Sequence, residues 1–212
     1  MNASASAIWV YGIGFVAQAL FGLRIVIQWW QTERKGAVVS PIYFWYASLA
    51  GSTLFMIYGL LRHDPIIVVA QVLSYFIYIR NLQLKHVWMT VPVSLRAVIW
   101  CLPVGIGGLL LHSSAAGEVD AAFSGTSDWV VLAGGSGQFF LSFRFVVQLY
   151  YSEKRKVSLL PREFWIISLA GSLLVIIYAW FRSDVVLLLV QFASMFVYAR
   201  NIVRLRSATV KS

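Results

Sequence analysis

The chain has 212 residues, of which 60% are hydrophobic and 12% are charged, and its formal net charge is +9. Soluble domains average about 45–50% apolar and about 25% charged residues, so this composition excludes an ordinary soluble globular protein. The single cysteine, Cys101, excludes a disulfide within the chain and a cysteine metal cluster.

Seven apolar segments are long enough to cross a bilayer, which takes about 17–25 helical residues. In chain order, we predict membrane spans at 7–30, 42–61, 65–82, 91–111, 129–150, 162–181 and 184–202. No positive charge precedes the first apolar run, which is typical of a first span rather than a cleaved signal peptide. The sequence therefore predicts an all-α, multi-pass integral membrane protein.

The lysines and arginines between the spans indicate the orientation. With the N-terminus outside, twelve of them lie on the cytoplasmic side, and only Arg62 and Arg182 lie outside. Cytoplasmic loops of membrane proteins carry an excess of lysine and arginine, so we predict an outer N-terminus and a cytoplasmic C-terminus. This bias explains the net charge, and we expect no nucleic-acid partner.

An internal repeat relates two parts of the chain. Residues 18–81 align with 138–201 at a constant offset of 120, without a gap and with 24 identities in 64 positions. Polar residues are kept and aliphatic residues drift, which indicates a duplicated three-helix unit. We predict a first repeat at 1–86, a linker helix with an extracytoplasmic loop at 87–128, and a second repeat with a cytoplasmic tail at 129–212. The seven transmembrane helices then form a 3+1+3 arrangement of parallel repeats, as in the SWEET sugar transporters.

Each span of the repeat carries its polar residues on one face. On the first span, Gln18, Arg24 and Gln28 fall within an arc of roughly 120°. Lipid cannot satisfy such groups, so these faces are expected to meet neighbouring helices or a cavity. Arginine donors suit phosphate or carboxylate, and aromatic faces suit sugar rings or isoprenoid chains. We predict a substrate site from both repeats: Arg24, Gln28, Gln18, Trp45, Tyr58, Gln71, Tyr78, Arg80, Asn81, Arg144, Gln148, Gln138, Trp165, Tyr178, Gln191, Tyr198, Arg200 and Asn201.

Structural roles for the same residues remain open. Arg24 and Arg144 could form salt bridges, and the glutamines and asparagines could join helices by hydrogen bonds. The pairs Arg62–Asp64 and Arg182–Asp184 are more typical of stabilised turns. The histidines lie in loops or at span ends, and no span contains a carboxylate pair, so we expect no catalytic site, metal or cofactor.

The residues GQFFLSFRFVVQ (137–148), SEKRK (152–156) and the later pattern P..FW..SL.GS resemble the lipid A biosynthesis N-terminal domain family, LAB-N. The resemblance covers both repeats, and the second repeat is the better match. The family is grouped with PQ-loop and SWEET-like membrane proteins. The resemblance implies a role in envelope glycolipid metabolism. We therefore expect the protein in the bacterial inner membrane, where the predicted orientation makes the N-terminus periplasmic. No glycosyltransferase domain is expected beyond residue 212, so the disaccharide synthase activity of fused family members is not expected here.

Three functions are compatible with the sequence. The first is a transporter or flippase for a polyprenyl-phosphate-linked sugar, such as an undecaprenyl phosphate derivative, or for a related glycolipid. The second is an accessory or anchor for a membrane glycosyltransferase, and the third is a SWEET-like transporter of a small sugar. Paired arginines within the membrane favour a substrate with a phosphate, so we expect the first. The sequence does not indicate the oligomeric state.

Overall fold

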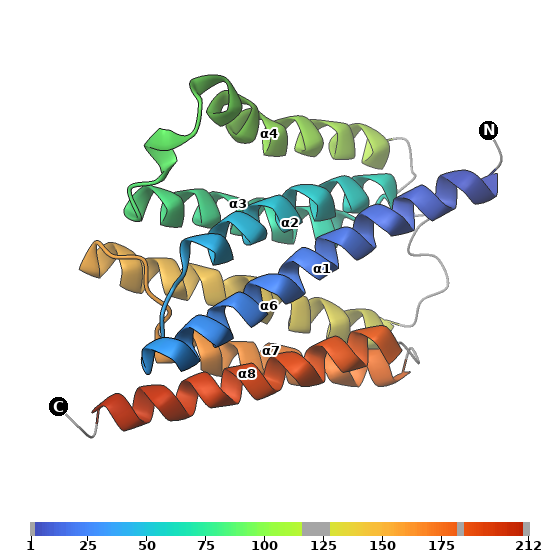
Figure 1. Cartoon of the computed structure of the whole chain (residues 1–212). Helices are drawn as coiled ribbons and strands as arrows, with labels where there is room; N and C mark the ends of the chain where they lie inside the picture. Colours follow the sequence, from blue (N-terminus) through green and yellow to red (C-terminus); the bar gives the residue numbers. More distant parts are fainter. Residues whose placement is uncertain (1–2, 116–127, 182–184, 210–212) are drawn as a thin grey trace. The chain divides into compact units, whose positions relative to one another are not determined.

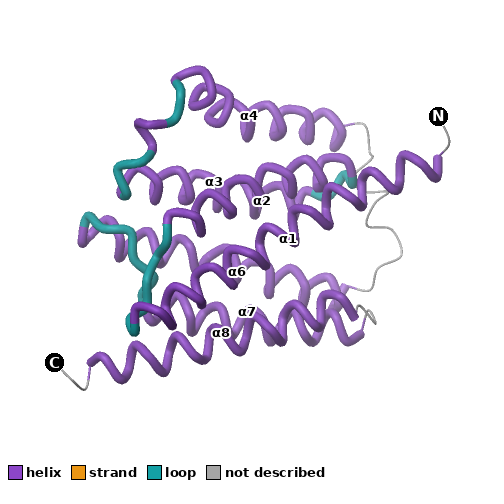
Figure 2. Tube along the Cα trace, in the orientation of Figure 1, coloured by secondary structure: helices purple, strands orange, loops and turns teal. Residues whose placement is uncertain are grey.

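The computed structural model describes residues 3–115, 128–181 and 185–209, and within these ranges the regular structure is entirely helical (Figures 1 and 2). Seven α-helices and one short 3₁₀-helix occur there: α1 (Ala3–Lys35), α2 (Ile42–Leu61), α3 (Pro65–Leu84), η1 (Trp88–Thr90), α4 (Val93–Ala115), α6 (Asp128–Arg155), α7 (Arg162–Phe181) and α8 (Val185–Thr209). The predicted all-α fold class is confirmed for this part of the chain. The pair Arg182–Asp184 and most of the predicted extracytoplasmic loop lie outside the described residues.

Five of the helices, namely α1, α2, α3, α4 and α7, are long and apolar enough to cross a membrane. This property supports a membrane protein. The predicted spans at 129–150 and 184–202 correspond to α6 and α8, which are not among the five. Both helices are interrupted by polar residues, including Arg144 and Gln148 on α6 and Asn201 on α8. Seven spans and the 3+1+3 arrangement therefore stay predictions.

The chain forms two compact units, which we describe one at a time. The first contains Met1–Phe21 and Tyr46–Gly125, and the second contains Gly22–Trp45 and Thr126–Ser212. The residues of α1 and of α2 are thus divided between the units. The domain boundaries at 86 and 128 are not tested by this division and stay predictions.

In the first unit, glycines allow α1 and α2 to approach closely. A Cβ atom on Gly14 would lie 2.8 Å from the Tyr58 ring, and one on Gly51 would lie 2.9 Å from the Phe21 ring. Small residues at helix contacts are typical of membrane proteins, where close backbone approach replaces the hydrophobic drive that water supplies. Asp64 caps α3, because its carboxylate accepts a hydrogen bond from the Ile67 N–H at 3.1 Å.

In the second unit, α6 packs against α7, and α7 packs against α8. A Cβ atom on Gly134 would lie 2.7 Å from the Tyr178 ring, so the contact of Gly14 with Tyr58 recurs 120 residues later. The core contains large aromatic side chains that are almost fully buried: Trp45, Phe145, Phe164 and Trp165. The duplicated sequence therefore produces the same helix contact in both units.

The first helix of each repeat ends in a left-handed turn at equivalent positions. Gly36 follows α1 with a φ of 67°, and Lys156 follows α6 with a φ of 53°. After α6, the Val157 N–H donates to the Ser152 carbonyl and the Lys156 N–H donates to the Glu153 carbonyl. These two bonds form the Schellman motif, which reverses the chain toward α7.

Candidate functional site: a buried cavity between two arginines

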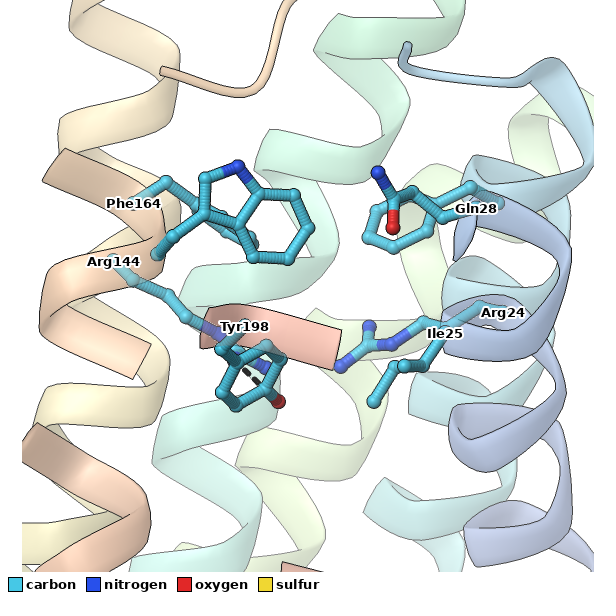
Figure 3. A pocket seen from close by; sticks show the side chains of 8 residues that line it. Arg24, Ile25, Gln28, Arg144, Phe164 and Tyr198 are labelled. Atoms are coloured by element: carbon cyan, nitrogen blue, oxygen red, sulfur yellow. Dashed lines mark hydrogen bonds between the residues drawn. The ribbon is translucent and has the colours of Figure 1, made fainter. Parts of the chain in front are cut away.

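Two arginines at equivalent repeat positions are buried in the second unit. Arg24 on α1 and Arg144 on α6 are each 5% exposed. Figure 3 shows them on opposite sides of one cavity, with both guanidinium groups directed toward the space between. A charge at bilayer depth is costly, at about 2.5–3.5 kcal/mol on insertion scales, so two such residues at one cavity mark it as the candidate site.

Aromatic rings surround both guanidinium groups. The guanidinium carbon of Arg24 lies 5.3 Å from the centre of the Phe145 ring, and that of Arg144 lies 5.0 Å from the same centre. The two cations are therefore no farther apart than the sum of these distances. Phe44 and Phe164, an identical pair in the repeat, lie 5.5 Å from Arg24 and 5.1 Å from Arg144 respectively. Ring faces stabilise a desolvated cation but do not cancel its charge.

Hydrogen bonds to neutral groups orient Arg144. Its Nη1 donates to the Ser168 hydroxyl at 3.0 Å. It also donates to the Tyr198 hydroxyl at 2.9 Å (Figure 3). The Ser168 hydroxyl in turn donates to the Phe164 carbonyl at 2.6 Å, which leaves its lone pair for the arginine. Since both partners are uncharged, the Arg144 charge remains available to an anion.

The cavity is about large enough for one water molecule. Five of the predicted site residues line it together with three apolar neighbours: Arg24, Gln28, Arg144, Trp165, Tyr198, Ile25, Phe44 and Phe164. Nitrogen donors and aromatic faces thus dominate the lining, and no carboxylate is among these residues.

The two tryptophans of the repeat differ in their hydrogen bonds. The Trp45 Nε1–H donates to the Ser40 hydroxyl at 2.8 Å, and Ser40 shares a 2.9 Å hydrogen bond with Ser158. Trp165 is 2% exposed, and its Nε1 has no hydrogen-bond partner among the described residues. Trp45 does not line the cavity, whereas Trp165 does.

Gln28 and Gln148, which are equivalent in the two repeats, each hold the loop that follows the first helix of their repeat. Gln28 donates to the Thr32 hydroxyl at 2.9 Å and to the Val39 carbonyl at 3.4 Å. Gln148 donates to the Ser152 hydroxyl at 2.7 Å and to the Leu159 carbonyl at 2.9 Å. The equivalent bonds show that these side chains have a structural role in both copies.

Gln28 has a further contact within the second unit. Its Nε2 donates to Asn201 Oδ1 at 3.0 Å, and Asn201 Nδ2 donates back to Gln28 Oε1 at 3.3 Å. Near the same end of α1, Glu33 forms ion pairs with Arg200, at 2.9 Å, and with Arg204. These contacts hold the end of α1 against α8.

The other predicted site residues do not line the cavity. Gln18, Tyr58, Gln71, Tyr78, Arg80 and Asn81 belong to the first unit. The second unit contains the rest, none of which is among the residues that line the cavity: Gln138, Trp45, Gln148, Tyr178, Gln191, Arg200 and Asn201. Gln191, for example, accepts a hydrogen bond from Ser172 at 2.9 Å. Their predicted contact with a ligand stays a prediction.

Sequence reasoning missed the phenylalanines that surround the arginines and the serine that holds Arg144. The identity of Phe44 with Phe164, and of Ser48 with Ser168, is the signal that could have identified them. Within the described ranges, no group of three or more histidine, cysteine, aspartate or glutamate side chains could hold a metal ion. The candidate site is therefore a donor-rich, aromatic-lined cavity suited to an anion.

Comparison with known proteins shows that the chain is similar to lipid-A-disaccharide synthases. It is 28% identical over 177 residues to a lipid-A-disaccharide synthase of Chlamydia pneumoniae, covering 80% of this chain and 29% of that protein. It is 26% identical to the corresponding synthase of Chlamydia muridarum, covering 84% of this chain and 31% of that protein. The chain thus spans about three tenths of the length of these curated relatives. No solved structure matches it.

A family described as the lipid A biosynthesis N-terminal domain matches the chain twice, at residues 13–83 and 133–203. The two matches are offset by 120 residues, as the internal repeat predicts, and together they cover about two thirds of the chain. The predicted resemblance is confirmed: the chain belongs to the lipid A biosynthesis N-terminal domain family and carries two copies of the domain in tandem.

Proposed function

We propose that the protein binds the phosphate of a polyprenyl-phosphate-linked sugar, or of a related envelope glycolipid, and moves its headgroup between the leaflets of the bacterial inner membrane. One observation carries this proposal: Arg24 and Arg144, both buried, line one cavity and share the ring of Phe145. A phosphate between them would receive charge-assisted hydrogen bonds and reduce the repulsion between two buried cations.

The chemistry of the lining favours a phosphate over a neutral sugar. A sugar hydroxyl could bond to an arginine but would bring no negative charge to a low-dielectric site that holds two cations. The planar donor fork of arginine matches the oxygens of a phosphate. The cavity is about large enough for one water molecule, and a phosphate is larger. A phosphate therefore enters only when the side chains that line the cavity move apart. We propose that this motion is part of the transport cycle.

Transport can be measured in phospholipid vesicles that contain the protein and a fluorescent polyprenyl-phosphate sugar. Dithionite, added outside, destroys the fluorescence of the outer leaflet only. With the wild-type protein, the inner-leaflet fluorescence is expected to be lost as well. With Arg24→Gln combined with Arg144→Gln, the loss is expected to stop at about half, as in protein-free vesicles.

Two controls separate specific transport from membrane damage. Arg155→Gln removes an exposed arginine at the C-terminal end of α6 and is expected to transport like the wild type. A fluorescent phosphatidylcholine is expected to stay protected, because general scrambling would expose it. Transport that the double arginine variant leaves unchanged, or an inactive wild-type protein, would contradict the proposal.

A second function is favoured by the relatives. Those from Chlamydia are called lipid-A-disaccharide synthases, and this chain corresponds to a minor part of their length. The arginine cavity would then hold a phosphorylated glycolipid for a membrane glycosyltransferase without moving it. Binding of the glycolipid without loss of inner-leaflet fluorescence, together with co-purification of a glycosyltransferase, would support this accessory role. Binding of a free sugar alone would support SWEET-like sugar transport instead.

A further inference from the structure

The indole N–H of Trp165 is a buried hydrogen-bond donor that meets no acceptor in the described part of the chain. The residue is 2% exposed and lines the arginine cavity, and its Nε1 has no partner among the described residues. Buried indole N–H groups ordinarily find an acceptor, because leaving one unsatisfied costs free energy. An unsatisfied indole donor at a cavity therefore indicates an acceptor that the protein itself does not supply.

The sequence explains why Trp165 differs from its repeat partner. Trp45 donates to Ser40, five residues earlier, at 2.8 Å. The residue five positions before Trp165 is Leu160, which is buried but has no hydroxyl. Both copies thus carry the tryptophan, but only the first copy has a hydroxyl five positions before it.

A second donor at the cavity has the same property. The Nη1 of Arg144 is bonded to Ser168 and Tyr198, but its Nε is buried and has no hydrogen-bond partner among the described residues. Arg144 and Trp165 both line the same cavity, so two donors of the second repeat meet there.

We infer that Trp165 is a specificity-determining residue whose Nε1–H donates to an oxygen of the bound phosphate, and that Leu160 keeps this donor available. The inference rests on the proposed phosphate-binding function and deepens it. The ligand must offer an acceptor oxygen to the indole edge while its negative charge is held by the arginines. A phosphate ester or a free phosphate meets both requirements, whereas a lipid without an anionic oxygen does not.

Two variants and two matched controls test this role by equilibrium binding of undecaprenyl phosphate in maltoside detergent. Trp165→Phe keeps an aromatic ring but removes the donor, and is expected to weaken binding about tenfold, since the acceptor is charged. Leu160→Ser keeps Trp165 but offers it an internal acceptor, as Ser40 does for Trp45, and is expected to weaken binding in the same direction. Ser40→Ala, and Trp180→Phe at an indole that is 71% exposed, are expected to bind like the wild type.

The indole N–H signal provides a readout that a merely structural role would not change. In ¹⁵N–¹H spectra, undecaprenyl phosphate is expected to shift one indole signal downfield, and that signal is absent from Trp165→Phe. In Leu160→Ser, the same signal is expected to be shifted before any addition. Inorganic phosphate is added in a parallel titration. A shift with inorganic phosphate alone, or one that requires the lipid, supports the inference and identifies the source of the anion.

The outcomes distinguish this inference from the proposed function. One result would overturn the role of Trp165 but support the arginine site. In that case Trp165→Phe and Leu160→Ser bind undecaprenyl phosphate like the wild type, whereas the double variant Arg24→Lys with Arg144→Lys does not bind it. If the wild-type protein binds neither undecaprenyl phosphate nor inorganic phosphate, both are wrong.

Discussion

Arg144 illustrates how single residues hold a charge in the interior of this protein. Its guanidinium lies among the rings of Phe145, Phe164 and Tyr198, at 5.0, 5.1 and 5.5 Å, and donates to two hydroxyls. The rings and hydroxyls fix its orientation without adding a negative charge. The side chain is thereby pre-organised for an anion, because little conformational freedom remains to be lost when the anion binds.

Tyr198→Phe tests this arrangement at the residue scale. The change removes the hydroxyl that accepts from Arg144 at 2.9 Å and leaves a buried N–H without that partner. The free energy of unfolding in detergent is expected to fall by about 1–3 kcal/mol. Tyr150→Phe, at a residue that is 64% exposed, is the control and is expected to have almost no effect. Equal losses in the two variants would contradict the role assigned to the Tyr198 hydroxyl.

The sequence identified some of these residues but not their partners. The depth of Arg24 and the repeat offset indicated that it and Arg144 belong together, and the structure places both at one cavity. Gln28 and Gln148 were predicted to contact a ligand from the same pattern, yet the structure also uses them to hold loops. Periodicity reveals that a side chain faces inward, but tertiary packing decides which inward group it meets.

At the scale of elements, the two copies of the repeat share the same helix–helix contacts, although many of their aliphatic residues differ. Gly14 with Tyr58, and Gly134 with Tyr178, give the same close helix approach in both copies. The predicted first span ended at residue 30, whereas α1 continues to Lys35. Apolar length alone could not predict this continuation, because the added residues are mostly polar; one of them, Glu33, pairs with Arg200 and Arg204 of α8.

The turns after α1 and α6 provide a prediction at this scale. Lys156 has a φ of 53°, a left-handed conformation that costs a residue with a Cβ about 1–2 kcal/mol. Lys156→Gly is therefore expected to raise the free energy of unfolding, by up to about 1 kcal/mol because glycine loses more backbone entropy on folding. Gly36→Ala, the reciprocal change at a φ of 67°, is expected to lower it by a similar amount. Denaturant titration of both variants checks the signs, and the same sign for both would contradict the interpretation.

At the scale of the whole molecule, the family match agrees with the internal repeat in its offset and extent. The polar identities between the copies made this duplication predictable from the sequence alone. Membrane character was equally predictable, because five described helices are apolar and long enough to cross a bilayer. The prediction of seven spans goes beyond these five helices and stays a prediction.

The orientation in the membrane gives a prediction at the scale of the molecule. With Cys101→Ser as background, a single cysteine is introduced as Asn2→Cys or as Ser212→Cys. The excess of cytoplasmic lysine and arginine predicts that an impermeant maleimide labels Asn2→Cys in intact spheroplasts, and Ser212→Cys only after lysis. Labelling of Ser212→Cys in intact spheroplasts would reverse the proposed orientation.

The central claim is that Arg24 and Arg144 together hold one phosphate. Dipolar coupling between ¹⁵N in arginine side chains and ³¹P measures this directly, in a maltoside detergent where undecaprenyl phosphate is the only source of phosphorus. The wild-type protein is expected to show coupling from two guanidinium groups to the phosphate. Arg24→Lys and Arg144→Lys are each expected to remove one of the two couplings. Absence of coupling in the wild type, or coupling that persists in the double variant, would contradict the account.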